Sequence, residues 1–138
     1  MATREEHKTR RRFGDRYREA RTEVVQQIEQ SVIGGDWGAN GYTTADQADC
    51  LAGALGLTPG ARLLDVGAGR GWPGLYLAVR TGCHVVLSDV PSEGLGDAIT
   101  RAGAEGVTKR VAAVVSSARA LPFRPGTIDA VVHTDVLC

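Results

Sequence analysis

The sequence predicts an α/β fold with a doubly wound parallel sheet that is incomplete, with about four strands, and an N-terminal helical extension. Two observations lead to this prediction. Short apolar runs alternate with helical segments from residue 61 onwards, which indicates βαβ units joined by right-handed crossovers. The first apolar run ends at Asp65, and Gly67, Gly69 and Gly71 follow at alternating positions. A strand, a glycine turn and a helix in succession let the backbone approach a nucleotide-like ligand closely.

The N-terminal extension is predicted to begin with one amphipathic helix over residues 3–31. Acidic residues interleave with the basic cluster at residues 10–12, so we interpret that face as solvated rather than phosphate-binding. The loop over residues 34–42 holds Trp37 and Tyr42, which either form a lid or pack on the sheet. The helix over residues 3–31 is inferred from apolar or small side chains that recur at steps of three and four residues: Phe13, Tyr17, Ala20, Val24, Ile28 and Val32.

The second half is predicted to start with a helix near residues 45–56, because Thr44 and Gln47 fit a capping box. Pro73 suits the first turn of a later helix, where the missing N–H of proline has no partner to lose. These elements divide the chain into a cap or lid, residues 1–43, and a ligand-binding domain, residues 44–138. Strands are expected near 61–66, 83–88, 110–116 and 128–134, and further helices near 72–81 and 93–103.

Composition restricts the expected function. A length of 138 residues predicts one domain. The formal net charge is zero, so no overall field draws the chain to nucleic acid or to membranes. No apolar run is long enough to cross a bilayer, and the N-terminus lacks the apolar stretch of a secretory signal. Three cysteines without metal-ligand spacing predict reduced thiols and no metal site. We therefore expect a cytoplasmic protein that binds neither nucleic acid nor membranes.

Polar residues are predicted to gather at the carboxyl ends of the strands. Asp65 follows the first strand, Asp89 the second and Ser117 the third, while His133 and Asp135 follow the fourth. Ligands of doubly wound sheets bind beyond these ends, at the point where strand order reverses. Four strand ends that carry polar side chains therefore predict one site.

The motifs resemble those of class I S-adenosylmethionine-dependent methyltransferases, over roughly residues 40–138. Residues 63–71, Leu-Leu-Asp-Val-Gly-Ala-Gly-Arg-Gly, are similar to the first motif of that family, and residues 88–90, Ser-Asp-Val, to its second-strand acid. Residues 118–123 and 127–132 resemble the exit of its third strand and its fourth strand. The resemblance implies a Rossmann-like fold, S-adenosyl-L-methionine as cofactor and methyl transfer to an unidentified acceptor, for which the neutral charge favours a small molecule.

The resemblance also implies roles for residues of the first two strands. Asp65 would contact the methionine end of the cofactor, although a buried acid there could instead cap the following helix. The bend beneath the cofactor would consist of Gly67, Ala68, Gly69 and Gly71. Asp89, with Val90 beside it, lies where a ribose-binding acid is expected and would accept hydrogen bonds from the ribose hydroxyls; capping of the next helix is the alternative.

The third and fourth strands follow the family pattern less closely. Many members carry an acid that contacts the adenine amino group at the position held here by Ser117. A serine hydroxyl accepts a hydrogen bond less strongly than a carboxylate, so adenine recognition is expected through Ser117 and the backbone of Ala118. The fourth strand offers His133 as a further cofactor contact. His133 and Asp135 are also candidates for a general base, which is needed only if the acceptor loses a proton.

Two other interpretations stay open. Residues 69–74 spell GxGxxG, which could indicate an oxidoreductase module that binds NAD(P) or FAD, although Asp65 and Pro73 fit that motif poorly. The chain could also be a non-catalytic remnant, because members of the methyltransferase family usually continue for three more strands. An uncovered fourth strand, residues 128–132, would then favour self-association through its open edge.

Overall fold

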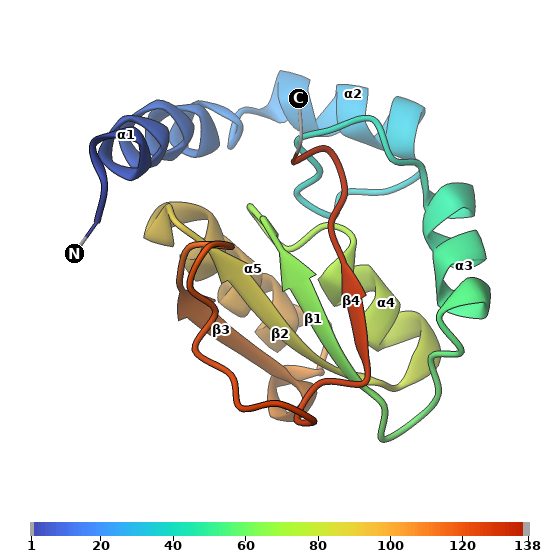
Figure 1. The fold of residues 1–138 in the computed structure, drawn as a ribbon. Helices are drawn as coiled ribbons and strands as arrows, with labels where there is room; N and C mark the ends of the chain where they lie inside the picture. Colours follow the sequence, from blue (N-terminus) through green and yellow to red (C-terminus); the bar gives the residue numbers. More distant parts are fainter. Residues whose placement is uncertain (1, 137–138) are drawn as a thin grey trace.

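The protein is described by a computed structural model that covers residues 2–136 and is built around one sheet of four parallel strands (Figure 1). The strands are β1 (Arg62–Val66), β2 (His84–Asp89), β3 (Val111–Val115) and β4 (Ala130–Val132), in the spatial order β3-β2-β1-β4. Because β2 and β4 flank β1 on opposite sides, strand order reverses between β1 and β4. The predicted parallel Rossmann-like sheet is thereby confirmed, with β4 ending two residues earlier than expected.

Helices α4 (Gly74–Thr81) and α5 (Ser92–Ala104) form the crossovers and lie on one face of the sheet (Figure 1). A short 3₁₀ segment, η1 (Thr108–Arg110), leads into β3. Helix α3 (Ala45–Ala54) packs beside α4. Its capping box is present as predicted, since the Thr44 hydroxyl accepts from the Gln47 N–H and the Gln47 side chain accepts from the Thr44 N–H.

The core lies between the sheet and these two crossover helices. Leu63, Val85 and Leu87 are buried there, together with Leu77 and Ala98 of the helices. Burial of each large aliphatic side chain stabilises the fold by about 1.5–3 kcal/mol. This packing fixes the carboxyl ends of β1 and β2, where polar residues were expected to meet.

The opposite face of the sheet has no helix over it within residues 2–136, and its exposed apolar side chains lie in the edge strands β3 and β4. Side chains alternate between faces along a strand, and Leu64 is in register with Val86 of β2 and Val131 of β4. No helix of the described residues lies over this side (Figure 1), and Val131 is 50% exposed. The edge strand β4 therefore presents apolar surface.

The prediction of one helix over residues 3–31 is wrong, because the chain breaks at residues 20–22. Helix α1 (Arg4–Glu19) ends there, and α2 (Glu23–Ile33) begins after Thr22, whose backbone is extended at φ −76° and ψ 147°. Because of this break, the residues of α2 do not continue the helical periodicity of α1. Three of the apolar side chains from which the single helix was inferred face solvent, with exposed fractions of 65%, 57% and 59%: Val24, Ile28 and Val32.

Two arginines hold this break in place. Arg70 is only 4% exposed, donates to the carbonyl of Ala20 at 3.3 Å and pairs with Asp97 of α5 at 3.1 Å. Arg21 pairs with the same Asp97 carboxylate at 2.7 Å. A cation at the last carbonyls of a helix is favourable, so the Arg70 guanidinium stabilises the end of α1.

Helix α1 consequently packs against α5, across the carboxyl ends of β2 and β3 (Figure 1). No helix in the described part of the chain is long and apolar enough to cross a membrane.

Candidate functional site

The glycine turn over residues 67–71 joins β1 to α4. Gly67, Gly69 and Gly71 all have positive φ, at 73°, 54° and 106°, a conformation that side chains with a Cβ rarely adopt. The N–H groups of Gly67 and Ala68 both donate to the carbonyl of Ser88, at 2.8 and 3.0 Å. The turn is therefore tied to the end of β2, which brings the first two predicted strand ends together.

Asp89 is fixed at this junction by backbone donors. Its Oδ2 accepts from the N–H of Gly69 at 2.7 Å, and its Oδ1 accepts from the N–H of Val90 at 2.7 Å. Burial raises the pKa of Asp89, while these two hydrogen bonds act in the opposite direction. Each carboxylate oxygen has two lone pairs, so the pair of backbone bonds orients the group and leaves a position on Oδ1, while the second position of Oδ2 faces the Tyr17 hydroxyl at 3.5 Å.

Asp65 lies one strand away and is 1% exposed. Its Oδ2 accepts from the N–H of Gly74 at 2.8 Å, at the start of α4. Desolvation raises the pKa of Asp65 well above its ordinary value, and the nearby charge of Asp89 raises it further. The helix-capping role considered for this residue is thus present, and a contact with a ligand stays a prediction.

The end of β3 forms one wall of a pocket of about 260 Å³. Val90 and Ser117 line it, and residues of the first turns of α1 close it from the other side. The Ser117 hydroxyl accepts from the Arg119 N–H at 3.3 Å, and Ala118 is exposed beside it. Val90 directly follows Asp89 in the chain, so this pocket adjoins the end of β2, and Val90 and Ser117 line it together.

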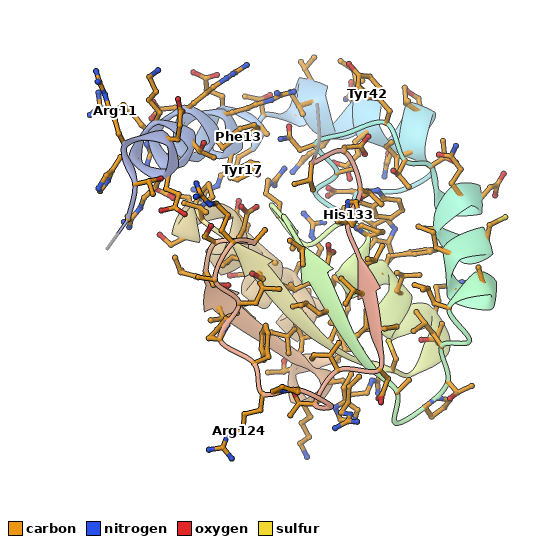
Figure 2. All side chains as sticks on the ribbon, in the orientation of Figure 1. Arg11, Phe13, Tyr17, Tyr42, Arg124 and His133 are labelled. Carbon is orange, nitrogen blue, oxygen red and sulfur yellow. The ribbon has the colours of Figure 1, made fainter. Side chains whose placement is uncertain are left out.

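The residues after β4 have a different arrangement. Asp135 has φ 56°, and its Oδ2 accepts from the N–H groups of Tyr42 at 3.0 Å and Thr43 at 3.3 Å, and from the Thr43 hydroxyl at 3.0 Å. This carboxylate thus anchors the loop that precedes α3. His133 is exposed near the end of β4 (Figure 2).

Tyr17 of α1 covers the glycine turn, a position that helical periodicity alone did not reveal. Its hydroxyl lies 3.5 Å from Oδ2 of Asp89, and a Cβ added at Gly69 would lie 3.1 Å from that hydroxyl. Burial raises the pKa of Tyr17, and the Asp89 charge raises it further. Figure 2 shows Phe13 and Tyr17 on the side of α1 that faces the strand ends. A tyrosine in the extension is therefore part of the site.

The two aromatic residues of the loop over residues 34–42 have separate positions. Trp37 is packed against the core, edge-on to Tyr76 with ring centroids 5.1 Å apart. Tyr42 is 88% exposed. Of the two possibilities for this loop, packing applies to Trp37, and Tyr17 rather than either loop residue covers the turn.

Comparison with known proteins identifies the family. Residues 63–138 match the family model described as "Methyltransferase domain". A glycine/sarcosine/dimethylglycine N-methyltransferase of Actinopolyspora halophila is 36% identical over 88 residues, which are 62% of this chain and 15% of that protein. A sterol 24-C-methyltransferase of Gibberella zeae is 33% identical over 81 residues, 59% of this chain and 21% of that protein. The chain thus spans a small part of the length of these curated relatives.

Solved structures share the fold. A SAM-dependent methyltransferase of Thiobacillus denitrificans in complex with S-adenosyl-L-homocysteine superimposes with a TM-score of 0.63 at 23% identity, over 83% of this chain and 44% of that one. A geranyl diphosphate methyltransferase in complex with GPP and sinefungin gives a TM-score of 0.60 at 30% identity, over 64% of this chain and 34% of that one. The sheet and its crossovers are therefore those of the family.

Proposed function

The chain belongs to the methyltransferase-domain family, and on this basis we propose that it is the cofactor-binding portion of an S-adenosylmethionine-dependent methyltransferase that acts on a small molecule. One observation carries the proposal. The Asp89 carboxylate is held at the end of β2 by the N–H groups of Gly69 and Val90, directly beside a turn whose glycines admit close approach.

The residues of the site fit this cofactor. Asp89 can accept from both hydroxyls of a ribose, because Oδ1 keeps a lone pair after its backbone bond and the second position of Oδ2 is held only by the long bond from the Tyr17 hydroxyl, at 3.5 Å. Asp65 is a buried carboxylate whose hydrogen bond to Gly74 uses one of about four lone-pair positions. An ammonium group near Asp65 would offset the cost of burying its charge. The methionine end of the cofactor carries such a group.

The chain positions the cofactor rather than activating it. When bound, S-adenosylmethionine supplies an electrophilic methyl group on a sulfonium, and the protein places the two reactants. Where the acceptor loses a proton, His133 is the better placed of the two candidate bases, because it is exposed at the end of β4. The Asp135 oxygen that anchors the loop already accepts three hydrogen bonds.

A dinucleotide site is less well supported. In that interpretation a pyrophosphate binds the N–H groups at the start of α4. The Gly74 N–H already donates to the Asp65 carboxylate, and Pro73, the residue before it, has no N–H to offer. A pyrophosphate at this position would lie close to the negatively charged Asp65, and neither Pro73 nor Gly74 would have a free N–H to donate to it.

The finer parts of the proposal follow from charge and exposure. The zero net charge favours a small-molecule acceptor over nucleic acid. A cytoplasmic location is in keeping with three cysteines that we interpret as reduced thiols. Residues 1–43 act as a cap over the cofactor domain at residues 44–138. Self-association occurs through the exposed edge of β4, where Val131 is half exposed.

Calorimetric titration with S-adenosylhomocysteine tests the cofactor assignment. Asp89→Asn should weaken binding at least tenfold, because charge-assisted hydrogen bonds contribute about 1.5–3 kcal/mol each. Asp129→Asn is the matched control: Asp129 pairs with Arg62 at the amino end of β1, at 2.8 Å, and its loss should change affinity less than twofold. Equal effects of the two substitutions, or tighter binding of NAD than of S-adenosylhomocysteine, would refute the assignment.

A further inference from the structure

The volume of the pocket next to Asp89 suits one group of the cofactor rather than the whole molecule. Whole small-molecule sites usually have about 300–1,000 Å³, and this pocket has about 260 Å³. It begins at Val90, the residue after the acid assigned to the ribose, and ends against α1. Under the proposed function, on which this inference rests, the group attached to that ribose is adenine.

The sheet itself offers the pocket no carboxylate for the adenine amino group. Ser117 stands at the end of β3, and its hydroxyl already accepts from the Arg119 N–H. The neighbouring Ser116 hydroxyl is engaged at 2.7 Å with the hydroxyl of Ser88. Both groups are neutral, so each accepts a hydrogen bond less strongly than an ionised acid.

Helix α1 brings a carboxylate to the same pocket. Among the described residues that line it, Glu6 is the only acid; the others are Ala2, His7, Arg10, Val90, Val115, Ser116, Ser117 and Ala120. Oε2 of Glu6 accepts from the Thr3 N–H at 2.7 Å, which fixes the side chain as the second half of the α1 capping box. The hydrogen bond with Ser117, followed by that from Thr3, lowers the pKa of Glu6.

The side chain of Glu6 is ionised, held by the Thr3 N–H, and lines the same pocket as Ser117. A carboxylate has about four lone-pair positions, and the bond from Thr3 leaves positions for a further donor. We propose that Glu6 of the N-terminal helix accepts a hydrogen bond from the exocyclic amine of adenine, in place of an acid at the end of β3. The N-terminal helix thereby reads the base and makes the site selective for adenine.

The test compares two ligands in two variants of the full chain. S-adenosylhomocysteine carries the amine, and S-inosylhomocysteine carries an oxygen at the same position. Glu6→Gln removes the charge but keeps the capping box, because glutamine serves equally at that position. Glu5→Gln is the matched control, since Glu5 lies one residue away in the same first turn and does not line the pocket. Circular dichroism checks that each variant is folded.

We expect Glu6→Gln to weaken binding of S-adenosylhomocysteine about fivefold, the difference between a charge-assisted and a neutral hydrogen bond. Binding of S-inosylhomocysteine should weaken less than twofold, so the preference for the adenine ligand falls. Glu5→Gln should leave both affinities unchanged.

Two outcomes overturn the inference, and they are distinguishable. If Glu6→Gln weakens both ligands equally, or has no more effect than Glu5→Gln, Glu6 does not read the amine while cofactor binding stands. If the unmodified chain is folded and binds neither ligand, the proposed function fails, and the role of Glu6 fails with it.

Discussion

Replacement of Gly94 by alanine should displace the glycine turn at Gly69, against which α5 packs closely. Gly94 lies in the first turn of α5, and a Cβ added there would lie 2.4 Å from the carbonyl oxygen of Gly69 and 2.7 Å from its carbonyl carbon. Both atoms belong to backbone, so the contact is relieved only if the turn or the helix moves. A Cβ added at Gly96, two residues further along, would meet no described atom within 4 Å.

The two positions separate steric overlap from helix propensity. Alanine in place of glycine within a helix stabilises it by at most about 1 kcal/mol, and both variants share this gain. Overpacking costs about 1–3 kcal/mol and applies to Gly94→Ala alone. Gly96→Ala should therefore raise stability by up to about 1 kcal/mol, and Gly94→Ala should be less stable than Gly96→Ala by about 1–3 kcal/mol.

Urea unfolding and thermal melts measure this difference. For a chain of this size, 1 kcal/mol corresponds to roughly 3–5 °C in Tm, so the two variants should differ by about 3 to 15 °C. Gly94→Ala should also weaken S-adenosylhomocysteine binding, because the displaced Gly69 N–H is the donor that orients Asp89. If both alanine variants are stabilised equally and bind alike, the close packing of α5 against the turn is wrong.

Two further substitutions test the electrostatics. Asp97→Ala leaves buried Arg70 without its carboxylate partner. The free energy of unfolding in urea should fall by about 2–3 kcal/mol, because an unpaired buried charge is costly. A decrease below about 0.5 kcal/mol would contradict this. The side-chain hydrogen bond from Arg62 lowers the pKa of Asp129 from 3.8 to about 2, so the stability that this pair adds is fully present above pH 3.8 and lost as pH falls through about 2. The Tm difference between the unmodified chain and Arg62→Ala should accordingly shrink between pH 5 and pH 2, and a difference independent of pH would exclude a folded-state ion pair.

The sheet could be predicted from the sequence because its signals are local. Each strand is a short apolar run bounded by turn residues, and Asp65 and Asp89 mark the ends of two of them. The capping box at Thr44 was equally readable, because both of its hydrogen bonds join residues three apart. Parallel pairing then follows from the alternation of strands and helices.

The N-terminal segment was harder to predict because tertiary contacts decide its shape. The apolar periodicity continues through residues 20–22, yet the chain breaks where Arg70 and Asp97, distant in sequence, hold the carbonyl of Ala20 and the side chain of Arg21. Helical periodicity identifies Tyr17 as an apolar position only. Its place over Asp89 depends on a contact between residues 72 apart, which periodicity cannot show.

The hydrogen bonds that the Asp135 carboxylate accepts from Tyr42 and Thr43 constrain the order in which the chain folds. They join residues 93 and 92 positions apart, and the Trp72 indole N–H donates to the Thr43 carbonyl at 3.0 Å in the same place. Closure of so long a loop is favourable only after the intervening sheet has brought its ends together. These hydrogen bonds between the loop before α3 and the residues after β4 consequently form late in folding and break early in unfolding. Amide exchange at Tyr42 and Thr43 would thus report the integrity of β4, a strand in which neither residue lies.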